Sequence, residues 1–352
     1  MHYLRRGAGG KFFFDCRMKK NVALALSSGG PRGFAYIGAI EVLQERGYTI
    51  TSVSGASAGA LVGGIFAAGG LEAFKQWLFA LDPVKVVSLM DFTPSRNYLV
   101  KGERVIRAIR DRVPDVRIED LPVPFVAVAT DLYTGEEVVF REGPLFDAIR
   151  ASISIPSMFR PVKWRGRTLV DGGLVNTFPL NRVQRSGDDI LVGFNVNRID
   201  AEGIGSYLAV RQAISDEQAA LREEVGDALR DTLASEADLF SKMREAGEQG
   251  SRFLKGRLEQ ERLERSLLAA GRENRIPVGA DDNYASILQR SFGIMNHTIA
   301  RMGLELCPPD ILVNLPFDSY HGVYGYSHAE EISARGRALM TEALDRYEAS
   351  RA

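Results

Sequence analysis

Residues 21–59 read NVALALSSGGPRGFAYIGAIEVLQERGYTITSVSGASAG, and this stretch decides the fold. An apolar run over 21–27 ends in Ser28-Gly29-Gly30, which predicts a buried strand that enters a tight loop. Apolar residues then recur at helical spacing until Gly47, and a second strand over 50–54 leads into a helix of small residues. The order strand, helix, strand, helix is typical of a parallel sheet covered by its crossover helices.

Five more short runs predict further strands, at 125–130, 137–140, 168–170, 190–195 and 311–314. Several of them are continuous apolar runs, as expected for strands that are covered on both faces. The sequence therefore predicts an α/β fold with a mainly parallel central sheet.

Composition divides the chain into four parts. Residues 1–20 show no period and are interpreted as an N-terminal tail, and residues 21–199 form the core. Residues 200–283 are highly charged with apolar residues at helical spacing, which predicts a helical insertion. Residues 284–352 complete the core and close with a helix over 327–347. Three roles for the insertion remain open: a lid, a hairpin that forms a homodimer, or an arm that contacts a membrane.

Composition also excludes several classes of function. Lys plus Arg number 44 against 45 Asp plus Glu, and the net charge of -1 predicts no strong bulk attraction to nucleic acid or anionic lipid. Cys16 and Cys307 form neither a disulfide framework nor a metal cluster, so we expect no metal or cofactor and a reducing compartment. The longest apolar run, 58–71, is shorter than the roughly 20 residues of a spanning helix. We expect a cytoplasmic protein that touches membrane surfaces transiently.

Gly55-Ala56-Ser57-Ala58-Gly59 matches G-x-S-x-G between a predicted strand and a predicted helix. Small residues around Ser57 allow a sharp turn that exposes its hydroxyl, and the helix N-terminus behind it favours developing negative charge. Ser57 is therefore the candidate nucleophile, with Gly55 and Gly59 shaping the turn. The alternative is a glycine-rich turn that merely packs tightly.

A serine nucleophile needs a base to accept its proton. None of the four histidines lies in a sequence motif that indicates a catalytic role; they are His2, His297, His321 and His328. A Ser-His-Asp arrangement stays open for the last three. Asp171, followed by Gly172-Gly173 at the end of a predicted strand, is the candidate base; a turn-closing aspartate is the alternative. With an ordinary pKa of about 3.9 it would depend on strong oxyanion stabilisation.

The loop Ser28-Gly29-Gly30-Pro31-Arg32-Gly33 is the candidate oxyanion hole, because its backbone can present N–H donors at a helix start. Pro31 has no N–H, so the amides of Gly29, Gly30 and Arg32 are the candidates, with Gly33 completing the loop. A phosphate-binding loop is the competing interpretation, but the Lys-Ser/Thr ending of a P-loop is missing.

Together the Gly29–Gly33 loop, the Gly55–Gly59 turn and Asp171-Gly172-Gly173 resemble, in order and spacing, the signature elements of the patatin-like phospholipase family. The resemblance continues through residues 151–156 and 159–162, covers about 21–196, and returns weakly over 310–345. Ser28 departs from it by standing where the family usually begins a run of three glycines.

The resemblance implies a three-layer α/β/α fold and a Ser-Asp dyad that hydrolyses lipid acyl esters through an acyl-enzyme, without histidine or metal. It assigns these roles to Ser57 and Asp171, with the Gly29-Gly30 loop as oxyanion hole. We therefore expect a serine lipid acyl hydrolase acting on phospholipids, lysophospholipids or related lipid esters. A non-catalytic lipid- or protein-binding module on the same fold and a Ser-His-Asp esterase are the alternatives.

An apolar stretch follows the nucleophile helix, and we expect part of it to line an acyl-chain site; burial in the core is the alternative. Its members are Leu71, Phe74, Trp77, Leu78, Leu81, Val84, Val86, Val87, Leu89, Met90 and Phe92.

Overall fold

A computed structural model describes residues 20–93, 98–199, 284–317, 320 and 324–351. The predicted tail, apart from its last residue, and the predicted helical insertion at 200–283 lie outside these residues. In the described ranges, none of the helices combines the length and the apolar composition that crossing a membrane requires.

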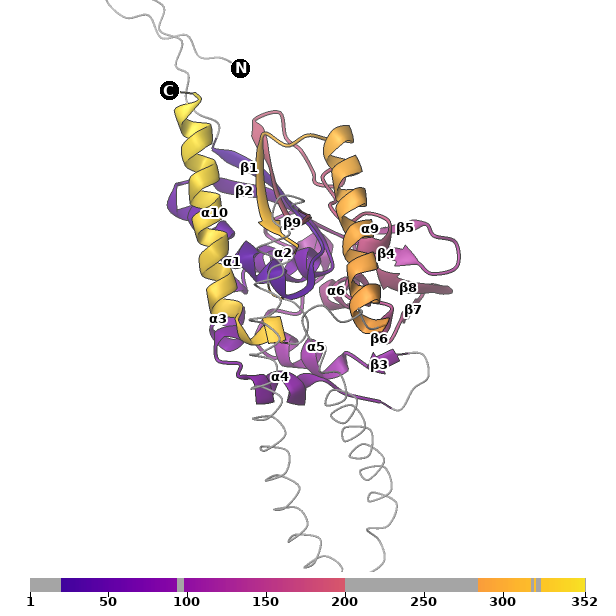
Figure 1. Ribbon diagram of the computed structural model, residues 1–352. Helices are drawn as coiled ribbons and strands as arrows, with labels where there is room; N and C mark the ends of the chain where they lie inside the picture. The colour runs from indigo at the N-terminus through magenta and orange to yellow at the C-terminus, as the bar shows by residue number, and fades with distance from the viewer. Residues whose placement is uncertain (1–19, 94–97, 200–283, 318–319, 321–323, 352) are drawn as a thin grey trace, which may run out of the picture.

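An eight-stranded sheet runs through the molecule in the order β10-β9-β1-β2-β4-β8-β7, with β5 also paired to β4 (Figure 1). Neighbours from β10 to β4 are parallel, and β5, β8 and β7 join in antiparallel pairs. The strands are β1 (Asn21–Leu26), β2 (Thr49–Ala56), β4 (Phe125–Asp131), β5 (Glu137–Phe140), β7 (Val162–Trp164), β8 (Arg167–Asp171), β9 (Asp189–Arg198) and β10 (Ile311–Pro316).

All seven predicted strands are confirmed. Three strands were not predicted: β7 and the separate parallel pair of β3 (Tyr98–Val100) with β6 (Ser157–Phe159). Each has only three residues, too few to show the two-residue alternation by which a strand is recognised.

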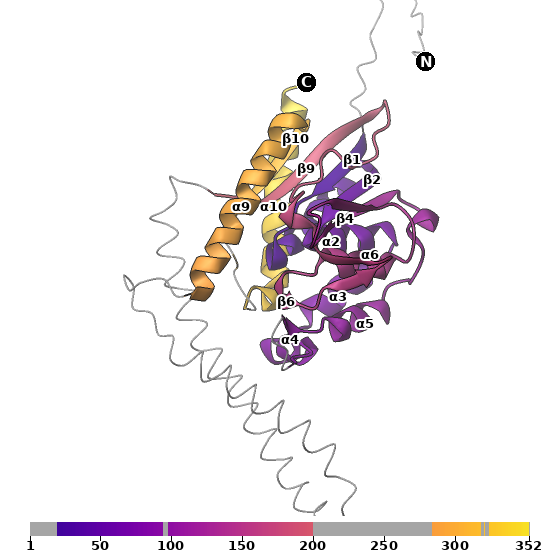
Figure 2. The same cartoon turned by 90° about the vertical axis from the view of Figure 1, so that its right-hand side faces the viewer.

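The helices are α1 (Ala35–Glu45), α2 (Ala58–Ala67), α3 (Leu71–Phe79), α4 (Pro83–Leu89), α5 (Glu103–Arg110), α6 (Leu145–Ser152), α9 (Tyr284–Leu306) and α10 (Ala329–Ala349). Three short 3-10 helices bear on the site: η1 (Gly30–Phe34), η3 (Gly172–Leu174) and η5 (Tyr324–Ser327). Figure 2 shows α3, α4 and α5 gathered below the sheet.

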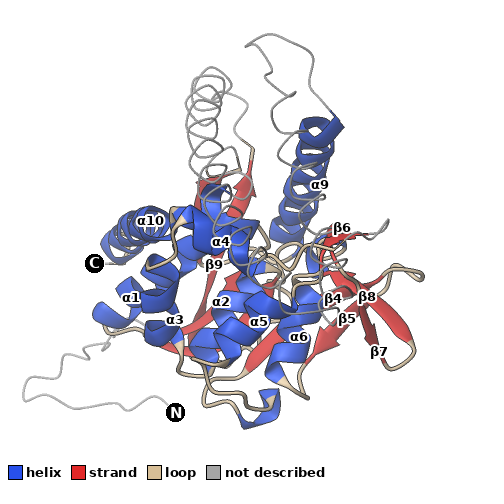
Figure 3. Ribbon diagram, turned by 90° about the horizontal axis from the view of Figure 1, so that it is seen from below, coloured by secondary structure: helices blue, strands red, loops and turns tan. Residues whose placement is uncertain are grey.

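Strand β1 shows why the sheet is buried on both faces. Val22, Leu24 and Leu26 point into the larger core cluster with residues of α1, α2, α6 and α10, whereas Ala23 and Ala25 join Phe178, Leu180 and Ala300 of α9. Successive side chains of a strand point to opposite faces, so a run without polar residues must be covered twice. Figure 3 shows α1, α2 and α6 along one face and α9 along the other. The three-layer α/β/α architecture is thereby confirmed.

Helix α10 closes the fold against α1, and in Figure 1 the edge strand β10 runs between α10 and α9. The two helices approach closely because each has a glycine at the crossing: a Cβ on Gly336 would lie 1.9 Å from the carbonyl oxygen of Ala35, and one on Gly38 would lie 2.1 Å from that of Ser333. Arg337 spans the same crossing through ion pairs with Glu41 and Glu45.

Candidate active site

Strands β2 and β8 meet end to end along one edge of β4. Strand β2 pairs with β4 in parallel, and the last pair is Ala56 with Val128. Strand β8 pairs with β4 in antiparallel fashion, and its last pair is Asp171 with Ala129, the next residue of β4. Strand β5 pairs with residues 127–130 of β4 and therefore occupies its other edge. The carboxyl ends of β2 and β8 thus stand at adjacent positions, which brings Ser57 and Asp171 together although 114 residues (171 minus 57) separate them in sequence.

Ser57 is the residue on which the chain turns from β2 into α2. Its backbone has φ 51° and ψ −118°, a positive φ that a residue with a side chain rarely adopts. Such strain costs on the order of 1–3 kcal/mol and persists only where the surroundings impose it. The turn places Ser57 at the N-cap of α2, where the helix dipole favours negative charge.

The two glycines of the turn allow close backbone approach. A Cβ on Gly55 would lie 2.3 Å from the carbonyl carbon of Gly59, and one on Gly59 would lie 2.3 Å from the carbonyl oxygen of Leu26. Neither position can hold a side chain unless α2 moves away from β1 and β2. The G-x-S-x-G spacing is thus a packing requirement of this turn.

Asp171 ends β8 and is almost fully buried, with 6% of its surface exposed. Its Oδ1 accepts the N–H of Gly173 at 2.7 Å, and Oδ2 is buried without a partner of normal hydrogen-bond geometry among the described residues. Burial raises the pKa of Asp171 to about 6, and the nearby Ser57 hydroxyl and the Gly173 N–H offset part of that rise.

The pKa of Asp171 therefore differs from the ordinary value expected from the sequence. A carboxylate whose pKa lies near 6 accepts a proton more readily than one near 3.9, since the best general base has a pKa close to the working pH. The cause, removal of the carboxylate from water, depends on the fold and leaves no mark in the local sequence.

A segment at the end of α6 holds both site residues. The Oγ of Ser152 accepts the backbone N–H of Ser57 at 2.8 Å, and the carbonyl oxygen of Ser154 accepts the backbone N–H of Asp171 at 3.0 Å. The other side of Asp171 is fixed by the Thr130 hydroxyl, which donates to its carbonyl oxygen at 2.9 Å. Residues 151–156 carry part of the family resemblance, but the sequence alone assigned Ser152 and Ser154 no role.

The predicted oxyanion loop enters η1 directly. Gly30 has φ 57°, a conformation that glycine adopts without strain. Hydrogen bonds of a 3-10 helix run from each N–H to the carbonyl three residues earlier, so the N–H groups of Arg32 and Gly33 lie within η1. Those of Gly29 and Gly30 stand at its start without an intrahelical acceptor. The geometry favours Gly29 and Gly30 as donors.

Arg32 and Gly33 have other contacts that position the loop. The Arg32 guanidinium donates to the carbonyl oxygens of Val196 at 3.0 Å and Phe317 at 2.8 Å, and stacks on the Phe317 ring at 4.4 Å. It therefore ties the loop to β9 and to the end of β10. Gly33 lies against α2, the helix that follows Ser57, since a Cβ there would be 2.5 Å from the Cβ of Ala58.

Ser28, which replaces a glycine of the family pattern, points toward the turn after Asp171. Its Oγ would lie 2.8 Å from a Cβ on Gly173, and it is buried without a hydrogen-bond partner among the described residues. The backbone of Ser28 is held by two hydrogen bonds. Its N–H donates to the carbonyl oxygen of Thr177 at 2.8 Å, and its carbonyl oxygen accepts the side-chain amide of Asn197 at 2.6 Å. The added side chain is thus accommodated between the loop and the Asp171 turn.

An apolar cavity of about 120 Å³ opens beside Ser57 and Gly30. Its walls come from η1, α2, α3, α4, α5, β3, β6, η5 and the segment after α6. Of the apolar stretch singled out in the sequence, Leu71, Val84, Val87 and Phe92 do not line it, and those that do are Phe74, Trp77, Leu78, Leu81, Val86, Leu89 and Met90. The other lining residues are Phe34, Ala58, Leu61, Val100, Val105, Ile109, Ile153, Ile155, Met158, Phe159 and Tyr326.

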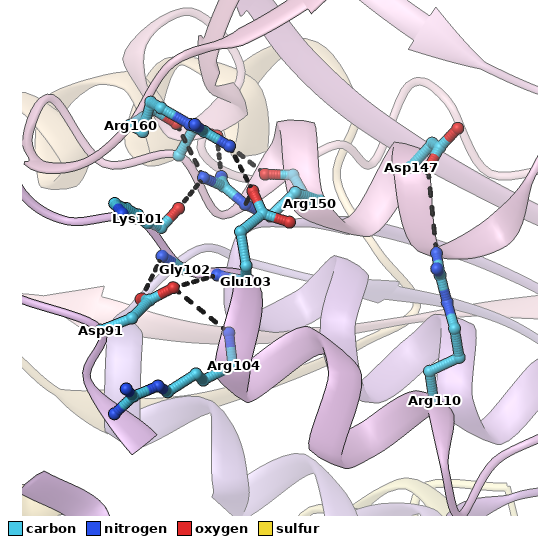
Figure 4. Close-up of polar contacts among 10 residues, drawn as sticks. Asp91, Lys101, Gly102, Glu103, Arg104, Arg110, Asp147, Arg150 and Arg160 are labelled. Atoms are coloured by element: carbon cyan, nitrogen blue, oxygen red, sulfur yellow. Dashed lines mark hydrogen bonds and ion pairs between the residues drawn. The ribbon is translucent and has the colours of Figure 1, made fainter. Parts of the chain in front are cut away.

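A buried arginine supports the wall formed by β3 and β6 (Figure 4). Arg150 of α6 donates to the carbonyl oxygens of Lys101 and Arg160 and to the Oγ of Ser154. Asp91 accepts the N–H groups of Gly102, Glu103 and Arg104 at 2.6, 2.9 and 3.3 Å and so caps α5. This framework joins the cavity wall to the same turn of α6 that holds Ser57.

The histidines within the described ranges stand apart from this site. The Nδ1 of His297 lies 3.1 Å from both the Ile199 nitrogen and the Asn197 carbonyl oxygen, and its tautomer decides which of the two it bonds. His328 is the N-cap of α10, and neither histidine lines the cavity. His2 and His321 lie outside the described residues. The described ranges also contain no group of three or more His, Cys, Asp or Glu placed to hold a metal ion.

Residues 24–183 match the model of a family described as patatin-like phospholipase. The chain belongs to the patatin-like phospholipase family, which confirms the resemblance seen in the sequence. It is 35% identical over 346 residues to an uncharacterised NTE family protein of Mycobacterium tuberculosis, covering 93% of this chain and 92% of that protein.

More distant similarity covers only the core. Patatin-like phospholipase domain-containing protein 6 of Mus musculus is 27% identical over 193 residues, which are 53% of this chain and 14% of the mouse protein. The crystal structure of VipD from Legionella pneumophila aligns with 58% of this chain and 55% of that chain, at 18% identity and a TM-score of 0.32. A structural similarity of this extent supports no conclusion about function.

Proposed function

We propose that this protein is a serine hydrolase that cleaves carboxylic esters of phospholipids, lysophospholipids or related lipids through a Ser57-Asp171 dyad. The observation that carries the proposal is the meeting of β2 and β8 on β4, which sets a serine hydroxyl beside a buried carboxylate of raised pKa. Family membership supports lipid hydrolysis in general. The residue roles are our inference from the geometry.

In the first half of the reaction, Ser57 Oγ attacks the ester carbonyl carbon and its proton passes to Asp171. Oδ2, which has no partner of normal geometry among the described residues, is the oxygen free to accept it. The carbonyl oxygen becomes an oxyanion, which the N–H groups of Gly29 and Gly30 and the start of α2 stabilise. The intermediate collapses to an acyl-enzyme on Ser57, and the departing alcohol takes the proton from Asp171.

In the second half, water replaces the alcohol. Asp171, again ionised, accepts a proton from the water as it attacks the acyl carbon, and the second tetrahedral intermediate has the same oxyanion donors. Its collapse breaks the bond to Ser57 Oγ, which takes back the proton, and the carboxylic acid leaves. Each proton accepted by Asp171 is returned, so the cycle balances without a cofactor.

The cavity supports a lipid as the acyl donor. It begins at Ser57 and is lined almost throughout by aliphatic and aromatic side chains, which would bury a hydrocarbon chain with its carbonyl carbon at the nucleophile. A polar acyl group would lose its hydration there without gaining hydrogen-bond partners.

The test is hydrolysis of p-nitrophenyl esters and of lysophospholipid by the full chain and a set of variants. Ser57→Ala and Asp171→Asn are expected to abolish hydrolysis, because one removes the nucleophile and the other its base. A triple variant with His297, His321 and His328 changed to Gln is the matched control and should retain the wild-type rate.

Two results would contradict the proposal. Loss of hydrolysis in the histidine variant would favour a Ser-His-Asp esterase. A folded wild type that cleaves none of the esters, and whose Ser57 does not react with a fluorophosphonate, would favour a non-catalytic lipid- or protein-binding module.

A further inference from the structure

A tyrosine hydroxyl faces the oxyanion loop from the C-terminal part of the chain. Tyr326 of η5 lines the cavity together with Ser57 and Gly30. Its hydroxyl would lie 3.8 Å from a Cβ on Gly30, so the phenol oxygen stands beside the loop. Among the described residues no hydrogen bond joins this hydroxyl to another group. Its hydrogen-bonding capacity is therefore open to a molecule in the cavity.

Contacts with the loop itself fix the position of this ring. Tyr326 meets Phe34 of η1 edge to face, with ring centroids 5.7 Å apart at 71°. The preceding residue, Gly325, lies against Pro31, since a Cβ there would be 2.7 Å from the Pro31 Cγ. Rotation of the phenol away from Gly30 would break the ring contact, and a shift of η5 away from the loop would break the approach of Gly325 to Pro31. The side chain is thus preorganised, as a group that stabilises a transition state must be.

The surroundings keep the phenol in its donor form. Burial is the main cause that raises the pKa of Tyr326 to about 12, nearby Asp171 adds to the rise, and Arg32 opposes it. At neutral pH the hydroxyl is therefore protonated and can donate a hydrogen bond, whereas it cannot serve as a base.

We propose that Tyr326 is a further catalytic residue, whose hydroxyl donates a hydrogen bond to the oxyanion formed on the substrate carbonyl. This inference rests on the proposed hydrolase function. The loop leaves only the N–H groups of Gly29 and Gly30 without an intrahelical acceptor, because Pro31 has none and Arg32 uses its own within η1. Tyr326 supplies a third donor and keeps its proton throughout, so every proton transfer still passes through Asp171.

The test compares Tyr326→Phe with Tyr320→Phe in the full chain. Tyr326→Phe keeps the ring and its contact with Phe34 and removes only the hydroxyl. We expect its kcat for a p-nitrophenyl ester to fall about 100-fold, as for loss of one oxyanion donor, with KM unchanged. Affinity for a trifluoromethyl ketone bearing the same acyl chain should fall in parallel. Tyr320, whose hydroxyl donates to Glu331 at 2.8 Å and which does not line the cavity, should tolerate the change.

The outcomes separate this inference from the function on which it rests. Equal kcat in Tyr326→Phe and wild type, with hydrolysis still lost in Ser57→Ala, would overturn the role of Tyr326 and leave the hydrolase standing. An equal loss in Tyr320→Phe would also overturn it, since the effect would then come from a disturbed C-terminal segment. Absence of hydrolysis by the wild type would overturn both proposals.

Discussion

The backbone of Ser57 predicts an unusual order of stability among its variants. Glycine adopts a positive φ freely, while alanine keeps the strain of the turn. Because strain relief outweighs the greater freedom of unfolded glycine, we expect Ser57→Gly to be more stable than Ser57→Ala by about 1 kcal/mol in urea unfolding, with both inactive.

Ser88, an exposed residue of α4, is the control, since glycine in a helix should there be less stable than alanine. Equal or lower stability of Ser57→Gly would show that the turn stores no strain.

Asp171 predicts a stability that depends on pH. Its folded-state pKa, about 6, lies above the ordinary 3.8, so the folded state holds the proton more tightly and loses stability as pH rises between these values. A difference of about 2 units corresponds to about 3 kcal/mol. At pH 7.5 Asp171→Asn should therefore unfold at a higher temperature than wild type, and near pH 3 the difference should vanish.

Asp82 supplies the opposite control. Its pKa is lowered, mainly by the Lys85 backbone N–H, so its contribution to stability is present above the unfolded pKa and is lost on acidification. Asp82→Asn should destabilise at neutral pH. A stabilisation by Asp171→Asn that does not change with pH would contradict the burial of a charge at Asp171.

At the residue scale the sequence singled out residues that the structure brings together, but it did not predict their surroundings. Ser57, Asp171 and the glycine loop can be recognised in the sequence because each belongs to a short motif whose spacing has a structural reason. The raised pKa of Asp171, the acceptor at Ser152 and the phenol at Tyr326 depend on contacts across roughly 100 residues or more of sequence. No local pattern marks them, although a buried Ser-x-Ser at the end of α6 is the one signal that could have been followed.

At the scale of elements, the end of α6 connects the cavity wall to the turn at Ser57, and Ser152 is the contact that tests this connection. Ser152→Ala leaves the buried N–H of Ser57 without its acceptor, which costs about 1–3 kcal/mol. We expect lower thermal stability and a reduced kcat, because the strained turn loses the bond that holds it.

Ser350→Ala is the matched control, because it removes a serine whose hydroxyl donates to the carbonyl oxygen of Tyr347 at the end of α10. It should change neither the thermal stability nor kcat. An unaltered kcat in a destabilised Ser152→Ala would show that Ser152 supports the fold without positioning Ser57.

Long, strongly patterned elements were predictable and short ones were not. The strand at 21–27 and the helix after Ser57 are bounded by glycine loops and carry unbroken apolar runs. In contrast β3 and β6 are three-residue strands that pair with each other, and Arg150 bonds the carbonyl that follows each of them. Each strand therefore has its partners in distant parts of the chain, which the local sequence does not contain.

At the scale of the whole molecule, the crossing of α1 and α10 joins the first and last parts of the described chain. Gly336→Ala would place a methyl group 1.9 Å from the carbonyl oxygen of Ala35, and backbone cannot give way as a flexible side chain can. Overpacking of this kind costs typically about 1–3 kcal/mol, so we expect a corresponding loss in urea unfolding.

Gly187→Ala is the control, because a Cβ there meets open space. Equal stability of the two variants would mean that the helices separate at little cost. A helix crossing of this kind cannot be predicted from the sequence, since a glycine lowers the helix propensity whether or not another helix packs against it.

The central claim is that Asp171 activates Ser57, and the pH dependence of Ser57 phosphonylation tests it most directly. The full chain would react with a fluorophosphonate at a series of pH values, with the adduct located by mass spectrometry. We predict a single adduct on Ser57, a rate that rises with pH through an apparent pKa of about 6, and loss of that reaction in Asp171→Asn. An adduct at another residue, or an equal rate in Asp171→Asn, would contradict the account.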